Sequence, residues 1–275
     1  MSHQPPYGEK SPSTLVRLLI WLSRNTLMGH GKLRKISHRL VQRLHDGPVD
    51  THLWGVPMRM DPHTNMSERK PMFRVDRYDP QERKFMHGIL HQSQQPVMID
   101  IGAHIATYSF DAVLNGPANT SAIAMEPQPR LNEQIRFNLD TIKASGNGRI
   151  NNLTLLGCAI GPSNGVARLE IPDGAHLAHV VKEGGVEVPQ RTLMSVLEEH
   201  GIDHIDFLKI DIEGYEGEAL GPFLQQADDS LLPRGIVMEH LHMDEWSHDI
   251  NGLLQKRGYG ETLRTRSNAI WTRQT

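Results

Sequence analysis

An apolar strand late in the chain runs directly into a group of acidic residues. The segment reads Phe207-Leu208-Lys209-Ile210-Asp211-Ile212-Glu213-Gly214-Tyr215-Glu216. Carboxylates at the end of a buried strand are costly unless they are paired, solvated or bound to a ligand. In open α/β sheets, ligands bind at this carboxyl edge. The segment therefore predicts one edge of an active site.

The acids of this segment have different expected roles. Asp211 and Glu213 are two residues apart, so they share one face if the strand continues that far. We count both as catalytic, Glu213 for substrate placement and Asp211, together with His240 or Glu239, for proton removal. Lys209 is expected to pair with one of the acids. Glu216 lies nearer the following helix, where the helix dipole favours a first-turn acid, and we interpret it as structural.

A second polar group ends the next expected strand, at Met238-Glu239-His240-Leu241-His242. His240 and His242 share one face of that strand and Glu239 takes the other. The two strands should be neighbours, so we expect Asp211, Glu239 and His240 to converge. Carboxylates and imidazoles bind divalent metals or act as general bases. The group predicts a metal site at these three residues or a catalytic base at His240, and a simple hydrogen-bonded pair is the alternative.

A strand, a tight turn and a helix start follow one another at Asp100-Ile101-Gly102-Ala103-His104-Ile105-Ala106-Thr107. A glycine at the turn lets the backbone approach a ligand closely, and a helix N-terminus favours polar or anionic groups. Asp100 at the strand end suits a cationic ligand group such as an ammonium or a sulfonium. The turn is not G-x-G-x-x-G, which disfavours a dinucleotide site.

An acid also ends the following strand, at Glu126-Pro127. An acid at this place can accept both hydroxyls of a ribose. The alternative is a solvated loop acid. Because the turn at Gly102 precedes it, we favour ribose binding.

The elements that carry these residues alternate between strands and helices from residue 96 onward, which predicts a doubly wound, mostly parallel α/β sheet. An inserted hairpin is expected over 161–190 and an antiparallel hairpin near the C-terminus. The expected strands are 97–101, 121–125, 153–160, 205–212 and 235–241, with helices over 107–114, 131–142 and 193–200 and final hairpin strands within 261–272.

The first 76 residues form an expected N-terminal extension, followed by the catalytic domain over 77–275. Residues 1–13 suggest a loose tail, residues 14–45 two helices broken at Gly29-His30-Gly31, and 53–60 a strand. Residues 1–45 contain eight Lys or Arg and one acid. We favour a helix that packs its apolar face, lined by Leu33, Ile36, Leu40 and Leu44, on the main domain. Contact of 14–45 with an anionic membrane or a polyanion is the alternative.

The whole-chain totals restrict the class of protein. The net charge of −3 over 275 residues does not show the excess of positive charge that is typical of nucleic-acid-binding proteins. The single cysteine, Cys158, excludes an intrachain disulfide and fits a reducing, cytoplasmic location. We interpret Cys158 as a packed side chain. No apolar run reaches the roughly 18 residues of a membrane span.

At these residues the sequence resembles the FkbM family of S-adenosylmethionine-dependent methyltransferases. The resemblance runs from about Arg77 to the C-terminus. Its carriers are the segments 97–104, 124–127, 159–161, 190–193 and 208–216, of which the last is the most specific. It implies a class I methyltransferase fold, which is Rossmann-like, and methyl transfer from S-adenosylmethionine, commonly to a hydroxyl.

The resemblance also implies roles for individual residues. Asp100 and Gly102 would line the methionine end of the cofactor, Glu126 would hold the ribose, and Asp211 would face the reaction centre. The expected cofactor site is completed by His104, Thr107, Tyr108, Pro127, Cys158 and Ala159, the last two near the adenine. Ala106 stands where such turns usually have a second glycine, and His104 where asparagine is common.

The sequence as a whole predicts an O-methyltransferase that acts on a small molecule, a sugar or a lipid-linked glycan. A neutral alcohol is a poor nucleophile, so we expect a base or a divalent metal beside the acceptor. Two alternatives stay open. One is a nicotinamide-dependent oxidoreductase on a similar fold, and the other is a membrane-associated binding module that uses residues 14–45.

Overall fold

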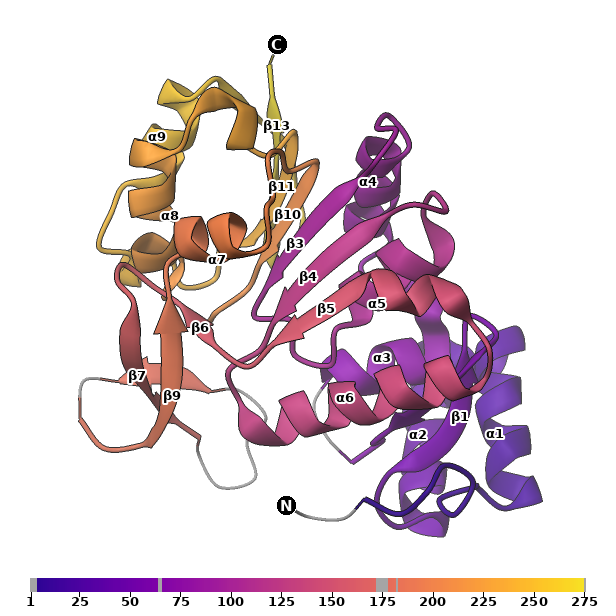
Figure 1. The fold of residues 1–275 in the computed structure, drawn as a ribbon. Coiled ribbons are helices and arrows are strands. Elements are labelled where there is room, and N and C mark those ends of the chain that lie inside the picture. The colour runs from indigo at the N-terminus through magenta and orange to yellow at the C-terminus, as the bar shows by residue number, and fades with distance from the viewer. Residues whose placement is uncertain (1–3, 64–65, 172–177, 182, 275) are drawn as a thin grey trace. The chain divides into compact units, whose positions relative to one another are not determined.

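The computed structural model describes residues 4–63, 66–171, 178–181 and 183–274. The chain forms two compact units (Figure 1). One comprises Met1–Pro80 with Glu133–Ile150, and the other Gln81–Asn132 with Asn151–Thr275. The first break lies near the expected boundary at residues 76 and 77. The sequence did not indicate that 133–150 join the N-terminal unit.

A seven-stranded sheet forms the centre of the second unit. Five strands are parallel, and a C-terminal hairpin adds the two antiparallel ones, as predicted. The order is β12-β13-β11-β10-β3-β4-β5. Chain order therefore reverses between β3 and β10, which is where such sheets bind ligands. The strands are β3 Val97–Ile101, β4 Ser121–Met125, β5 Leu153–Leu156, β10 Phe207–Ile210, β11 Gly235–Glu239, β12 Tyr259–Arg264 and β13 Asn268–Arg273.

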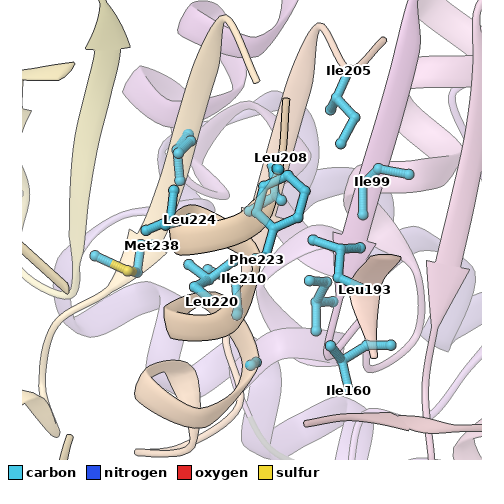
Figure 2. Packing of buried hydrophobic residues seen from close by; sticks show 14 of the residues in the cluster. Ile99, Ile160, Leu193, Ile205, Leu208, Ile210, Leu220, Phe223, Leu224 and Met238 are labelled. Atoms are coloured by element: carbon cyan, nitrogen blue, oxygen red, sulfur yellow. The ribbon is translucent and has the colours of Figure 1, made fainter. Parts of the chain in front are cut away.

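Helices cover both faces of this sheet. Apolar side chains of α7 (Leu193–Glu199), α8 (Glu216–Gln226) and α9 (Ile250–Lys256) pack on one face, around Phe223 and Ile99 (Figure 2). On the other face, Phe85 of α4 (Pro80–Leu90) lies against Gly235, and α5 (Thr107–Asn115) packs on β3 and β4. Alternate residues of β3 thus face different layers.

The chain leaves the central sheet after Leu156, so the single strand expected over 153–160 is wrong. Gly157 lies against the Asn132 side chain, whose Nδ2 donates to the Glu126 carbonyl at 3.1 Å. The continuation pairs instead in a second sheet of order β6-β9-β7-β8, which contains the expected insertion. These strands are β6 Ala159–Ile160, β7 Gly165–Glu170, β8 His179–Val181 and β9 Val186–Arg191.

The first unit contains the predicted pair of N-terminal helices. The break expected at Gly29-His30-Gly31 is confirmed, because the first helix ends at Asn25 and the second begins at Gly31. A Cβ at Gly29 would lie 2.1 Å from the Ser23 carbonyl oxygen. The single strand expected over 53–60 is instead a hairpin, whose turn residues Trp54 and Gly55 both have positive φ. The elements are α1 Thr14–Asn25, η1 Leu27–Gly29, α2 Gly31–Leu44, β1 Val49–Leu53, β2 Val56–Met60, α3 Met66–Arg74 and η2 Val75–Arg77.

Helix α6 (Pro129–Ala144) contributes to both units, and short helices η3 (Gly148–Asn152), η4 (Asp229–Leu231) and η5 (Met243–Glu245) complete the described elements. In no described part of the chain is a helix both long and apolar enough to cross a membrane.

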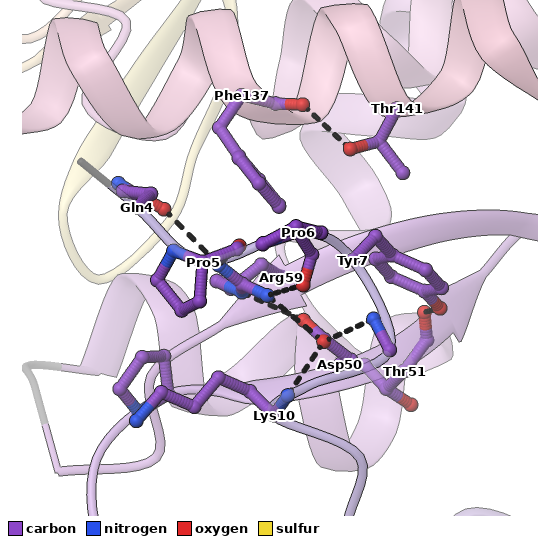
Figure 3. Close-up of polar contacts among 12 residues, drawn as sticks. Gln4, Pro5, Pro6, Tyr7, Lys10, Asp50, Thr51, Arg59, Phe137 and Thr141 are labelled. Carbon is purple, nitrogen blue, oxygen red and sulfur yellow. Dashed lines mark hydrogen bonds and ion pairs between the residues drawn. The ribbon is translucent and has the colours of Figure 1, made fainter.

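A buried arginine orders the N-terminal segment, which the sequence suggested to be loose (Figure 3). Arg59 pairs with both Asp50 oxygens at 2.7 and 2.9 Å and donates to the carbonyls of Pro5 and Pro6. Its guanidinium carbon lies 4.1 Å from the centre of the Phe137 ring. Because a buried charge is stable only when paired, these contacts tie the segment to the hairpin.

Candidate active site

Asp100 is the last residue but one of strand β3, and its carboxylate is buried on the α5 side of the sheet. The side chain is 1% exposed, and its Oδ2 accepts a 2.6 Å hydrogen bond from Ser109 Oγ of α5. Within the described residues Oδ1 has no hydrogen-bond partner. Burial raises the pKa of Asp100, and the charge of Lys209 opposes that shift. A buried oxygen without a donor is costly and can accept one from a ligand.

Gly102 allows two loops to approach closely at the sheet's switch point. Its φ is +73°, and a Cβ added there would lie 2.1 Å from the Asp211 carbonyl oxygen. The amides of Gly102 and Ala103 both donate to the Met125 carbonyl at 3.0 Å. Only glycine fits this position, as the sequence suggested.

The rest of the turn is held in left-handed backbone conformations. His104 has φ of +55° and Ala106 has φ of +57° and lies directly before α5. An L-residue in this region costs about 1–2 kcal/mol more than glycine. This cost accounts for the glycine that the family resemblance leads us to expect at the position of Ala106. Thr107 and Tyr108 are buried at the start of α5.

Glu126 follows β4, and both its oxygens accept backbone hydrogen bonds. Oε2 accepts from His104 N and Oε1 from Gln128 N, each at 2.8 Å. The residue is 6% exposed, and burial raises the pKa of its carboxyl to about 7. The same carboxylate thus joins the turn after β3 to the loop after β4, next to the half-buried Pro127.

Cys158 and Ala159 are both 5% exposed and lie where the chain leaves the sheet. Burial raises the pKa of the Cys158 thiol to about 11. A thiol with such a pKa is a poor nucleophile near neutral pH, in agreement with its interpretation as a packed side chain.

The acidic segment departs from the expected geometry. Strand β10 ends at Ile210, and Glu213 has φ of +54°, so Asp211 and Glu213 do not share a strand face. The Asp211 amide still pairs with the Ile101 carbonyl, and its carboxylate contacts Lys209 Nζ at 3.1 Å, as predicted for the lysine. Glu213 turns toward His242, with Oε2 at 3.3 Å from Nε2.

Glu216 is structural, as expected. Its carboxylate accepts hydrogen bonds from the amides of Ile212 and Gly214 and from Trp246 Nε1, at 2.8, 3.1 and 2.9 Å. It therefore caps the loop that carries the other two acids.

The group that could hold a metal is not the one expected. Ligand atoms of Glu213, Glu239 and His242 lie within 4.8 Å of one another. His240 instead bonds through Nε2 to the Thr265 carbonyl at 3.1 Å. The reason is that β11 ends at Glu239, so the alternation assumed for 240 and 242 does not hold there.

Burial and negative charge act together on Glu239. It is 8% exposed, and burial, with the charges of Asp211 and Glu213 nearby, raises its pKa to about 8. Its Oε2 has no hydrogen-bond partner in the described structure. A proton or a cation at this place would relieve the repulsion.

Sequence reasoning missed two contributors to the site. Ser109 holds Asp100, and its only sequence signal is its position on the first turns of the helix that follows the glycine turn. His242 was noticed beside His240 but not selected, since the end of β11 was placed two residues too late.

The sequence profile of the methyltransferase FkbM domain matches residues 100–260, which is more than half of the chain. The chain belongs to the FkbM methyltransferase family. The matched region contains Asp100, Glu126, Asp211 and Glu239. Membership in this family supports a methyltransferase, and S-adenosylmethionine is the methyl donor that the family implies. A comparison with curated proteins gave no match.

Several solved methyltransferases are similar to this FkbM-family chain. A methyltransferase FkbM from Methylobacillus flagellatus KT has 19% identity and a TM-score of 0.46, over 65% of this chain and 43% of that protein. The METTL16 MTase domain has 12% identity and a TM-score of 0.49, over 81% and 75%. A precorrin-6y C5,15-methyltransferase from Geobacter metallireducens GS-15 has 17% identity and a TM-score of 0.43, over 71% and 88%. The chain thus spans under half of the first of these proteins.

Proposed function

We propose that this protein transfers the methyl group of S-adenosylmethionine to a hydroxyl oxygen of a small molecule, a sugar or a lipid-linked glycan. The observation that carries the proposal is the unpartnered, buried Oδ1 of Asp100 beside the glycine turn of a methyltransferase fold. A donor such as the amino group of the cofactor's methionine end would satisfy this oxygen.

The remaining residues fit the same ligand. Glu126 lies at the end of the next strand, where its carboxylate can exchange the His104 or Gln128 amide for ribose hydroxyls. Pro127, Cys158 and Ala159 continue from this edge and are the proposed adenine side. S-adenosylmethionine, when bound, supplies a methyl group activated by a sulfonium.

The acceptor side is built from the acids after β10 and β11. We assign proton removal from the acceptor hydroxyl to Asp211, whose carboxylate is one-third exposed and held by Lys209. Glu213 is the proposed group that orients the acceptor. We transfer the role first given to His240 to His242, because His242 is the histidine paired with Glu213.

A divalent cation fits the same group. Glu213, Glu239 and His242 offer two carboxylates and an imidazole, and the free Oε2 of Glu239 faces no hydrogen-bond donor among the described residues. Oxygen and nitrogen ligands of this kind suit Mg²⁺, Mn²⁺ or Zn²⁺. The cation would act as a Lewis acid toward the acceptor oxygen.

Peripheral membrane contact is a second proposal, and a specific observation favours it. The expected burial of the α2 stripe is wrong: Leu33, Ile36 and Leu44 are each about half exposed. The buried face of α2 is instead the adjacent one, where Ser37 lies against Ser23 of α1. Leu15, Leu18 and Trp21 of α1 are equally exposed. We propose that these side chains and the basic residues among them hold a cytoplasmic enzyme at anionic lipid.

Calorimetric titration with S-adenosylhomocysteine tests the main proposal. Wild-type protein should bind, and Asp100→Asn and Glu126→Gln should each weaken binding at least about tenfold, a change of about 1.4 kcal/mol. Asp228→Asn, at an exposed acid outside the site, is the control and should bind normally. No binding by wild type, or equal binding by all variants, would reject the proposal.

Vesicle sedimentation tests the membrane proposal separately. Replacing Leu18 and Trp21 by serine should reduce binding to phosphatidylglycerol vesicles severalfold, because about half of each side chain is exposed. Leu263→Ser, at an exposed leucine of β12, is the control. Unchanged sedimentation of the double variant would contradict the proposal.

A further inference from the structure

A basic hollow lies in the first unit, between α2 and the segment formed by α3 and η2. Its volume is about 420 Å³. Seven of the described residues that line it are Lys or Arg, and none is acidic. Those used below are Arg34 and Arg39 of α2 and Arg69 and Lys70 of α3. A concave surface with charges of one sign concentrates ions of the opposite sign.

The cations that line the hollow differ in their pairing with acids. Arg74 pairs with Asp76 through Nε at 2.8 Å. Within the described residues, Arg34, Arg39 and Lys70 form no ion pair with a carboxylate. Arg34, Arg39 and Lys70 therefore share the hollow without a matching acid among the described residues. An anion in the hollow would offset their positive charge.

The floor of the hollow is aromatic and carries a buried ring nitrogen. The His38 ring stacks on Phe73 with 4.0 Å between ring centres, and its Nε2 has no partner in the described part of the chain. Burial, together with the charges of Arg69 and Arg34, lowers the pKa of His38 to about 4. The pKa of His38 is therefore sensitive to the positive charges that line the hollow.

We propose that this hollow binds a phosphorylated organic molecule through a phosphate or diphosphate group. Arginine guanidinium groups match phosphate oxygens in pairs, and lysine adds a point charge. The volume accommodates a diphosphate, and the His38–Phe73 stack offers an apolar surface to the organic part. This site is separate from the proposed methyl-transfer chemistry and does not depend on it.

Titration with inorganic pyrophosphate at constant ionic strength tests the proposal. Wild type should bind saturably. The double variant Arg34→Gln/Lys70→Gln should bind at least about tenfold more weakly. The matched control is Lys32→Gln/Arg43→Gln, which removes the same charge from exposed positions of α2 outside the hollow. Equal weakening in both doubles would show general charge attraction and would overturn the proposal, as would the absence of saturable binding by wild type.

A measurement on the wild type covers the case in which a variant fails to fold. Pyrophosphate should raise the pKa of His38, followed by NMR, because a nearby anion favours the imidazolium. Sodium chloride of the same ionic strength should not. An unchanged His38 titration in saturating pyrophosphate would overturn the proposal.

Vesicles distinguish the two sources of the phosphate. If Arg34→Gln/Lys70→Gln loses both pyrophosphate and vesicles of phosphatidylcholine with phosphatidic acid, the ligand is a lipid headgroup. If it loses only pyrophosphate, the ligand is a free phosphorylated molecule. Either result supports the phosphate site, whereas a double variant that retains both ligands contradicts it.

Discussion

The acids at the ends of β3 and β4 differ from those at the ends of β10 and β11. Glu126 is held by two backbone amides, and Asp100 is held by one hydroxyl with one oxygen open. The acids beyond β10 and β11 instead crowd one another, and burial together with the charges of the neighbouring acids raises the pKa of Glu239. Under the proposed function, the ends of β3 and β4 are ordered in advance for a fixed ligand. The ends of β10 and β11 bring several carboxylates together, and an acceptor proton or a cation can reduce the repulsion between them.

Gly102→Ala is expected to have the largest effect on the proposed cofactor site at the ends of β3 and β4. The new Cβ would lie 2.1 Å from the Asp211 carbonyl oxygen, at a φ of +73°, so the two loops must separate. We expect loss of S-adenosylhomocysteine binding by calorimetry and at least about 2 kcal/mol lower stability by urea unfolding. Gly88→Ala in α4, with no atom near its Cβ, should be neutral or stabilising. Normal binding by Gly102→Ala would refute the close approach.

A pH series tests whether Glu126 is held protonated at this edge. Its folded pKa is raised from 4.5 to about 7, so the associated stabilisation is complete below about pH 4.5 and is lost as the pH rises through 7. At about 1.4 kcal/mol per unit the loss is about 3 kcal/mol. Glu126→Gln should flatten this part of the urea-unfolding curve, and Asp228→Asn should not.

Ligand binding gives a second readout of the same group. Ribose hydroxyls that donate to Glu126 favour its carboxylate, so S-adenosylhomocysteine should release a proton near pH 6.5. Calorimetry in buffers of different ionisation enthalpy measures this release. Binding without proton release would contradict ribose contact at Glu126.

Metal titration tests the proposed cation site beside the acceptor. Mn²⁺ at one hundred times its dissociation constant should stabilise the protein by about 2.7 kcal/mol. His242→Ala should remove most of this effect, because His242 belongs to the group with Glu213 and Glu239. His240→Ala is the matched control, since His240 bonds to the Thr265 carbonyl. A larger loss in His240→Ala would restore the site expected from sequence.

Ala106→Gly has the smallest expected effect. It should slightly strengthen the proposed cofactor site. The residue has φ of +57°, and relief of this conformation is worth about 1 kcal/mol after the entropy of glycine in the unfolded chain is subtracted. We expect slightly higher stability and up to severalfold tighter S-adenosylhomocysteine binding. Ala103→Gly, at ordinary φ, should instead lower stability. A destabilised Ala106→Gly would contradict the strain.

Much of the second unit could be predicted because its signals are local. Buried-strand runs, helical spacing and a glycine turn depend on neighbouring residues, and they placed Asp100, Gly102 and Glu126 at the right strand ends. Errors arose where strands end. Ile210 and Glu239 are followed by loops that apolar periodicity does not mark, so the histidine that joins Glu213 was misassigned.

The sequence by itself determined the α/β class, the mostly parallel sheet, the FkbM resemblance and the presence of acids at the carboxyl ends of the strands. Only the tertiary structure decided which side chains meet: Ser109 with Asp100, Arg59 with Asp50, and His242 with Glu213. The physical reason is that hydrophobic periodicity reports burial along one element. Hydrogen bonds and charge pairs between elements depend on register, loop ends and backbone conformation, which single-sequence patterns do not contain.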